Sequence, residues 1–185
     1  MVSLKDKRGK SVILRSENKR EQWLGLGLIL IGAGLRMLPH PDNFTPVTAI
    51  ALFSGVVLPP SIALTLPLIV MISTDLIIGP HPLFWLVWGA FSLVSLLGVW
   101  LRGNSKPRTV IFGTVAGSVL FFVLTNLGVF LFENMYPHTR EGLARCFTMA
   151  LPFFRNSLLG DLFYSAVFFG IFATAKLRAP AGIRG

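Results

Sequence analysis

The sequence VIFGTVAGSVLFFVLTNLGVFLF, residues Val110–Phe132, decides the fold class of this protein. It contains no charged residue, and most of its side chains are aliphatic or aromatic. A helix that crosses a membrane needs about 20 predominantly apolar residues, with a range of roughly 17–25. The stretch therefore predicts a transmembrane α-helix.

Five further apolar stretches lie outward from this one. The breaks between them are rich in Pro, Gly and Asn, which form turns. No strand-like alternation appears, and open sheets cannot cross hydrocarbon. The sequence therefore predicts an all-α membrane protein, a bundle of six transmembrane helices. The other five predicted spans are Trp23–Leu38, Phe44–Leu58, Ser61–Ile78, Leu83–Leu101 and Leu151–Ala175.

The composition supports lipid as the main solvent. Hydrophobic residues make up 53% of the 185 residues and charged residues 14%, with a mean hydropathy of +0.69. Soluble domains carry about 25% charged residues. Between Trp23 and Leu101 the only charged residues are Arg36, Asp42 and Asp75. Such a stretch cannot cover a water-exposed surface.

The placement of the basic residues predicts the topology. The net charge of +9 is concentrated in clusters beside apolar stretches, as in cytoplasmic loops of membrane proteins, so nucleic acid is not an expected partner. With six crossings, the N-terminal arm, the Arg102–Arg108 loop and the C-terminal segment from Lys176 lie on one side and hold 13 of the 17 Lys and Arg residues. We therefore expect a multi-pass protein of the cytoplasmic (inner) membrane with both termini cytoplasmic. Its parts are a basic arm (1–22), a six-helix domain (23–176) and a tail (177–185).

The N-terminus is basic and then apolar, which resembles a signal peptide. The sequence Arg36-Met37-Leu38-Pro39 follows where cleavage would need small residues, so we expect an uncleaved first span. The single cysteine, Cys146, excludes an internal disulfide.

Small residues form possible packing seams on two spans. Gly113-x-x-x-Gly117 is a close-approach motif in the fifth span. In the first span, Gly27 and Gly34 lie two turns apart, and so do Gly25 and Gly32. These seams predict either packing within the bundle or a docking face for a membrane partner.

All three histidines fall in predicted outer loops, each directly after a proline: His40, His81 and His138. Imidazole and carboxylate groups are common metal ligands. The spacing is not diagnostic of a metal site, because no two histidines form a short ligand pair. We therefore assign no metal ligands, although a membrane enzyme that uses the histidines and a metal remains an alternative.

Ionisable residues within the spans carry more information. Asp75 lies near the outer end of the third span, and Asn126 lies in the fifth. The sixth contains Arg155, Asn156 and Asp161. Charges at such depth usually face the bundle interior or a wet cavity. One interpretation is a structural ion pair, of Arg36 or Arg155 with Asp75 or Asp161. The other is the polar floor of a ligand pocket that opens outward.

Motifs of common enzymes are absent. The chain contains no G-x-S-x-G, H-E-x-x-H or phosphate-binding glycine loop. We therefore expect no enzymatic activity and no cofactor. A chain without an ATP-binding loop would need another subunit to energise uptake.

Two stretches resemble an uncharacterised family of small six-span bacterial membrane proteins: LRMLPHPDNFTPVTAIALFSG (Leu35–Gly55) and Ala150–Tyr164 with its LPFFRNSLLGD. The pattern is more distantly similar to the substrate-binding (S) components of energy-coupling factor vitamin transporters. That resemblance implies capture of a small molecule from outside and docking on a transmembrane coupling subunit with ATPases.

The leading hypothesis is therefore a membrane substrate-binding component for uptake of a small vitamin-like molecule or its precursor. Its expected partners are the lipid bilayer, the ligand and such a coupling subunit. The alternative is a non-catalytic accessory or assembly subunit of a larger membrane complex. The expected substrate-binding residues are Arg36, His40, Asp42, Asn43, Phe44, Asp75, His81, Asn126, Arg155, Asn156 and Asp161.

Overall fold

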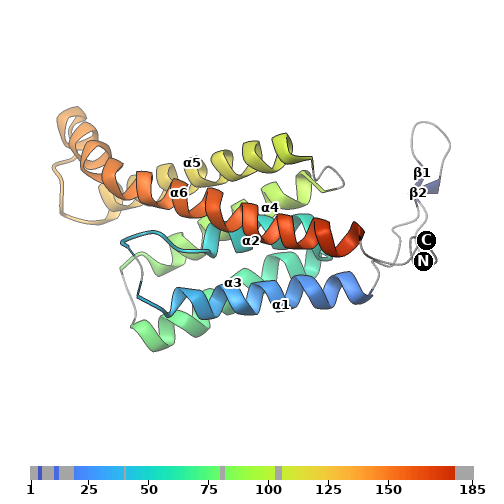
Figure 1. Ribbon diagram of the computed structural model, residues 1–185. Helices are drawn as coiled ribbons and strands as arrows, with labels where there is room; N and C mark the ends of the chain where they lie inside the picture. The colour runs from blue at the N-terminus through green and yellow to red at the C-terminus, as the bar shows by residue number, and fades with distance from the viewer. Residues whose placement is uncertain are drawn as a thin grey trace.

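The computed structural model describes residues 4–5, 11–12, 19–39, 41–79, 82–102 and 106–177. Two strands of two residues, β1 (Leu4–Lys5) and β2 (Ser11–Val12), pair antiparallel. All other elements in the described ranges are helices (Figure 1). They are α1 (Lys19–Arg36), α2 (Val47–Val57), α3 (Pro60–Ile78), α4 (Phe84–Trp100), α5 (Pro107–Phe132) and α6 (Arg140–Leu177).

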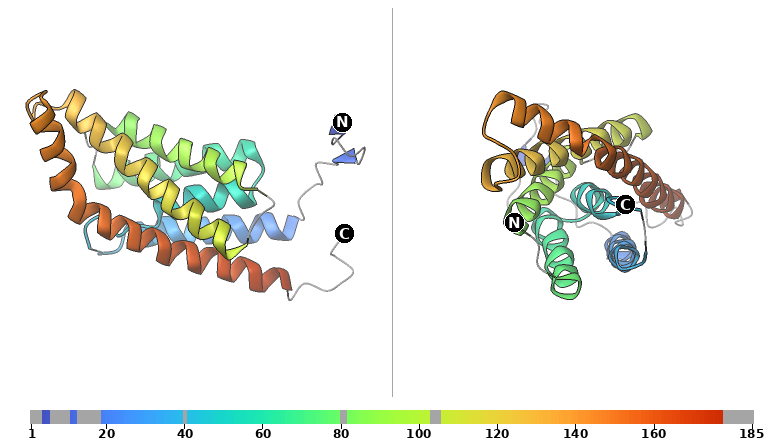
Figure 2. Two further views of the ribbon diagram at one scale, coloured as in Figure 1. Left: turned by 90° about the horizontal axis from the view of Figure 1, so that it is seen from above. Right: turned by 90° about the vertical axis from the view of Figure 1, so that its left-hand side faces the viewer.

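Helix α2 is the centre of the bundle. It contacts each of the other helices, and these contact one another in the order α1, α3, α4, α5, α6 and back to α1. Figure 2 shows α2 enclosed by this ring in the end-on view. All 11 residues of α2 are buried. Its sequence, VTAIALFSGVV, combines small residues with apolar ones, so neighbouring helices can approach it from every side.

Two glycines allow α2 and α4 to touch through their backbones. A Cβ added at Gly98 of α4 would lie 2.9 Å from the Cα of Gly55 of α2, and one added at Gly55 would lie 2.7 Å from the Cα of Gly98. Real Cβ atoms do not approach other atoms so closely. The close crossing of the two helices therefore requires glycine at both positions.

Arg102, which follows the C-terminal end of α4, caps the C-terminal end of α2. Arg102 donates to the carbonyl oxygen of Gly55 at 2.8 Å and to that of Leu58. The last carbonyls of a helix lack partners within the helix and carry partial negative charge. Arg102 was expected to be one of several loop charges beside headgroups, but its side chain serves the interior of the bundle.

The Gly113–Gly117 motif packs inside the bundle. Gly113 faces side chains of Leu52 and Leu101, and Gly117 faces Val94. This agrees with the interpretation that the Gly113–Gly117 seam packs within the bundle. The face of α1 that contains Gly27 and Gly34 differs, because in the described part of the chain no atom beyond the helix's own neighbouring backbone lies within 4 Å of a Cβ added at either position.

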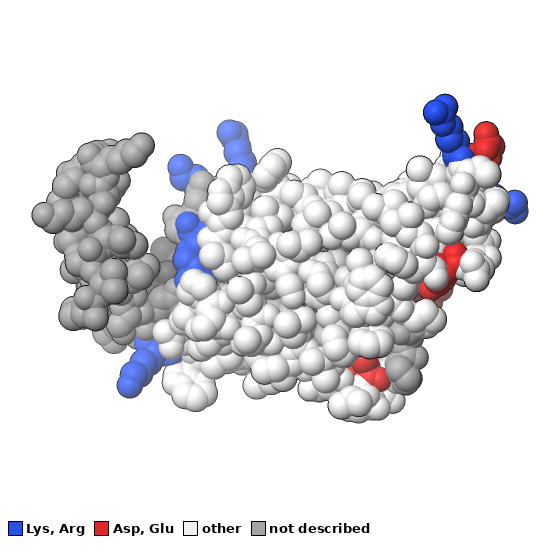
Figure 3. All heavy atoms as spheres, turned by 180° about the vertical axis from the view of Figure 1, so that it is seen from behind, with Lys and Arg blue, Asp and Glu red and all other residues white. Residues whose placement is uncertain are grey.

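The outer surface of the bundle is apolar. Side chains such as Trp23, Leu76 and Phe112 are 60–81% exposed. Figure 3 shows a broad band without charged side chains between charged groups at the two ends of the molecule. Three helical stretches are long and apolar enough to cross a membrane: α3, α5 and residues Arg140–Ala175 of α6. These features are those of a membrane protein.

Two helices begin earlier than the predicted spans. The sixth span was predicted to begin at Leu151, but α6 already begins at Arg140 and runs through Pro152. A proline inside a helix removes a backbone hydrogen bond and favours a bend, but it does not require the helix to begin there. Figure 2 shows α6 bent in its first half. Helix α1 also begins at Lys19, so the end of the predicted 1–22 arm is helical.

Candidate functional site

The bundle contains a cavity of about 370 Å³ above the N-terminal end of α2. Because α2 begins only at Val47, the helices around it enclose space that a longer central helix would fill. Residues from all six helices and from the α1–α2 connection line this space. They are Arg36, Asn43, Thr45, Val47, Thr48, Met71, Val87, Phe91, Ser118, Phe121, Phe122, Thr125, Asn126, Ala150, Phe153, Phe154, Ser157 and Asp161.

A buried carboxylate lies at the floor of the cavity. Asp161 of α6 is 2% exposed and accepts a hydrogen bond of 2.7 Å from the Ser118 hydroxyl of α5. The hydroxyl of Thr48, the second residue of α2, also bonds to it. One turn further along α5 and α6, the hydroxyls of Thr114 and Ser165 are hydrogen-bonded at 3.0 Å. The floor is therefore a polar layer that joins three helices.

Aromatic rings form the cavity walls. Phe91 of α4 and Phe121 of α5 are stacked, with ring centroids 4.6 Å apart. Phe122 of α5 and Phe154 of α6 lie with centroids 4.5 Å apart. Flat apolar walls with a few directed polar groups are typical of small-molecule sites.

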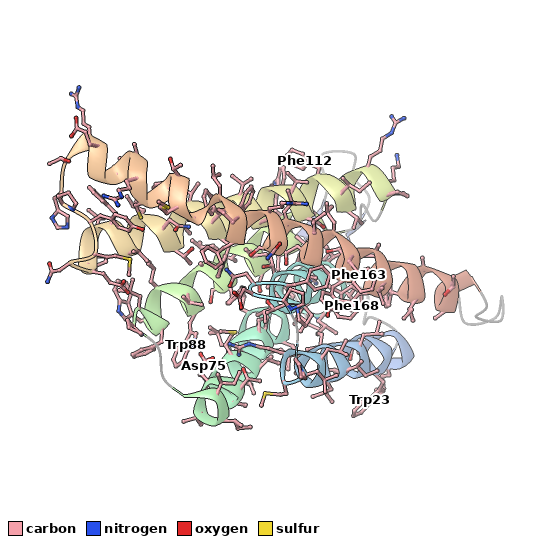
Figure 4. The ribbon with its side chains drawn as sticks, turned by 60° about the vertical axis from the view of Figure 1, so that its left-hand side comes forward. Trp23, Asp75, Trp88, Phe112, Phe163 and Phe168 are labelled. Carbon is pink, nitrogen blue, oxygen red and sulfur yellow. The ribbon has the colours of Figure 1, made fainter. Side chains whose placement is uncertain are left out.

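An arginine at the end of α1 lines the cavity and is held in place from α3. Arg36 Nη2 lies 2.8 Å from Asp75 Oδ1, and Arg36 also donates to the Thr74 hydroxyl. The other oxygen of Asp75 accepts a bond of 2.9 Å from Trp88 Nε1 of α4. Figure 4 shows Asp75 and Trp88 side by side. This network fixes α1, α3 and α4 relative to one another and is the ion pair that one interpretation of the sequence anticipated.

The α1–α2 connection closes over the cavity and is anchored on α6. Asn156 Nδ2 donates to the carbonyl oxygen of Asp42 at 3.1 Å. The Phe44 ring packs against Phe163 and Tyr164, with centroids 6.1 and 5.7 Å apart. Asn43 has a left-handed backbone (φ 61°), which Asn tolerates better than most residues. A second hollow of about 360 Å³ adjoins the cavity and shares Arg36 and Asn43 with it.

The structure brings together only some of the expected site residues. Arg36, Asn43, Asn126 and Asp161 line the cavity. Asn126 also donates to the Phe122 carbonyl of its own helix.

The other expected site residues do not line the cavity where the structure describes them. Asp75 holds Arg36, while Phe44 and Asn156 hold the connection. Asp42 lines the second hollow, and Arg155 is exposed on α6. His40 and His81 lie outside the described residues.

Sequence reasoning missed the hydroxyl and aromatic residues of the cavity. Ser118 and Thr125 of α5 lie on one helix face with Asn126, and this polar stripe could have been recognised from its spacing of seven and eight residues. The phenylalanines gave no such signal, because the chain has 16 of them and many face outward.

The chemistry of the site is that of hydroxyl, amide and carboxylate groups beside aromatic rings. Within the described ranges, no group of three His, Cys, Asp or Glu side chains could hold a metal ion. His138 is exposed and contacts the Phe130 ring. What the site offers is a partly enclosed space with hydrogen-bonding groups at one end and aromatic rings around it.

Fold and site together define a helical membrane protein with an internal cavity. Residues 16–182 match the DUF6580 family, a family of unknown function, and the chain belongs to that family. No curated protein and no solved structure shows significant similarity to the chain.

Proposed function

We propose that the protein is a membrane substrate-binding component for uptake of a small vitamin-like molecule or its precursor. The observation that carries this proposal is the cavity of about 370 Å³, with Asp161 buried at its floor. Its volume falls in the range of roughly 300–1,000 Å³ that small-molecule sites occupy. A plain membrane anchor has no need of such a space.

The proposed topology has six crossings of the cytoplasmic (inner) membrane, with both termini in the cytoplasm. Helix α2 alone covers only about 17 Å at ~1.5 Å per residue, less than the ~30 Å of hydrocarbon. The connection that precedes it completes the crossing. Irregular backbone is tolerated at membrane depth where it lines a cavity, and Asn43 and Thr45 of this connection do so.

The length of α6 supports an outward position of the cavity. Counting back from Ala175, about 20 residues at ~1.5 Å rise cover ~30 Å of hydrocarbon and end at Arg155. An exposed arginine is tolerated at this outer boundary, where its side chain reaches the headgroups. Asp161 then lies ~9 Å below the boundary. A ligand from outside reaches it without crossing the membrane.

In this proposal, ligand enters beside the α1–α2 connection and settles between the aromatic walls. The Arg36–Asp75 pair keeps the α1 end of the opening in place. The chain captures the ligand, and release to the cytoplasm is driven by a transmembrane coupling subunit with ATPases. The distant resemblance to S components supports this last step.

The test is ligand binding by the full chain purified in mild detergent. We expect at least one compound from a panel of vitamins and their precursors to raise the melting temperature, and native mass spectrometry to show one bound molecule. Phe121→Trp, which fills cavity space, should abolish the shift. The matched control Phe112→Trp, on the exposed face of the same helix, should keep it. A panel without any hit would contradict the proposal.

A second candidate, an accessory subunit of a larger membrane complex, is favoured by one observation. The open face of α1 at Gly27 and Gly34 adjoins the exposed Leu30 and Ile31. This candidate predicts stoichiometric co-purification with large membrane partners and no ligand in the cavity. Affinity purification from native membranes separates the two functions.

A further inference from the structure

We infer that the cavity selects a planar aromatic ligand whose cationic or N–H-rich end faces Asp161. This inference rests on the proposed binding function and specifies the ligand class for the same site. The floor, the walls and the charges of the cavity together support this ligand class.

The charges that line the cavity do not balance. Among the described residues that line the cavity, Arg36 and Asp161 are the only ionisable ones. Arg36 forms its ion pair with Asp75, outside the lining set, so the two charges largely cancel. Within the described part of the chain, no Lys, Arg or His side chain pairs with Asp161, whose partners are the hydroxyls of Ser118 and Thr48. Asp161 thus contributes the cavity's uncompensated charge.

The hydrogen-bonding groups around Asp161 stabilise its ionised form, but burial of the carboxylate opposes ionisation until a counter-charge arrives. Two hydroxyl groups donate to Asp161, and the N-terminal end of α2, at Val47 and Thr48, lies beside the same space. A helix N-terminus carries roughly half a positive charge. An ionised group away from water remains costly until a counter-charge reaches it. A cationic ligand group supplies that counter-charge.

The walls add shape selection to charge selection. Two pairs of Phe rings line the cavity, and aromatic rings accept a planar ring by offset or edge contacts. Aromatic faces also attract cations within about 6 Å of the ring centroid. A volume near the lower end of the ~300–1,000 Å³ range fits a compound of one or two rings.

Three probes of the same shape separate charge from shape: 2-naphthamidine (cation), 2-naphthamide (neutral) and 2-naphthoate (anion). Their dissociation constants are measured at pH 7 by equilibrium dialysis against the full chain in nanodiscs. We expect naphthamidine to bind about ten- to a hundredfold more tightly than naphthamide, and naphthoate to bind weakest. In Asp161→Asn, the preference for the amidine should vanish while naphthamide still binds, which shows that the cavity is intact. Glu141→Gln, which changes an exposed acid of the same helix, should leave the ranking unchanged.

The outcomes distinguish this inference from the function on which it rests. Equal binding of amidine and amide, or tightest binding of naphthoate, overturns the ligand class and leaves a binding protein. Binding of no probe also overturns the ligand class, and the vitamin panel then decides the function alone. The ranking in the unaltered chain is sufficient to reject the inference if Asp161→Asn cannot be produced.

Discussion

At the scale of single residues, Arg36 shows how one side chain serves both structure and site. It lines the cavity, yet its guanidinium is held by Asp75 and Thr74 of α3. Asp75 is held in turn by Trp88. Because these partners come from other helices, the position of the cavity lining depends on bonds that lie outside the cavity.

Removing one member of this pair should destabilise the protein strongly. Both side chains are largely buried, at 13% and 8% exposure, so Arg36→Met leaves the Asp75 charge without its counter-ion. We expect a loss of about 3–5 kcal/mol in the free energy of unfolding. The double variant Arg36→Met/Asp75→Leu should recover part of it, because no charge then remains buried. Chemical unfolding in detergent, followed by tryptophan fluorescence, measures both values.

The control is Arg140→Met, which removes an exposed arginine at the start of α6. It should change the stability by less than about 0.5 kcal/mol. If Arg36→Met were no more damaging than this control, the network would not hold the helices together.

At the scale of elements, the crossing of α2 and α4 depends on the absence of side chains at Gly55 and Gly98. Gly98→Ala places a methyl group against the α2 backbone, so the helices must move apart. We expect a cost of about 1–3 kcal/mol, as for other overpacked interiors. The matched control, Gly89→Ala, lies on the same helix with nothing within 4 Å of the added Cβ. Thermal unfolding of the two variants should differ clearly, and equal melting temperatures would contradict the close crossing.

The sequence predicted the elements better than their arrangement. Apolar length alone placed five of the six helices to within a few residues of their observed bounds. It did not show that α2 is central, since lipid-facing and interior positions carry the same residue types. On α5, Phe112 faces outward and Phe121 faces the cavity, and no pattern of polarity distinguishes them.

The candidate site was predictable where charge or amide groups occur. Asp161, Arg36 and Asn126 stood out in apolar stretches because such groups are costly in lipid. Ser118 and Thr48 did not stand out, because hydroxyl groups are common in membrane helices and can bond to their own backbone. Only the three-dimensional arrangement shows that both bond to Asp161.

At the scale of the whole molecule, the proposed six crossings predict which loops lie on each side of the membrane. In a Cys146→Ser background, Met135→Cys in the α5–α6 connection and Lys106→Cys before α5 introduce single thiols at opposite ends of α5. We expect a membrane-impermeant maleimide to label the first in intact spheroplasts and the second only after lysis. Labelling of both before lysis, or in the reverse order, would contradict the proposed topology.

The central place of α2 also constrains how the protein is made. This helix leaves the ribosome second, but its partners Arg102 and Asp161 are synthesised long after it. Until then its polar ends and its apolar sides must be covered by lipid or by the insertion machinery. Helices that depend on later segments form native contacts only when the chain is nearly complete. A premature stop codon before α6 therefore leaves no smaller working protein, but a fragment whose second helix has lost its support and which quality-control proteases will remove.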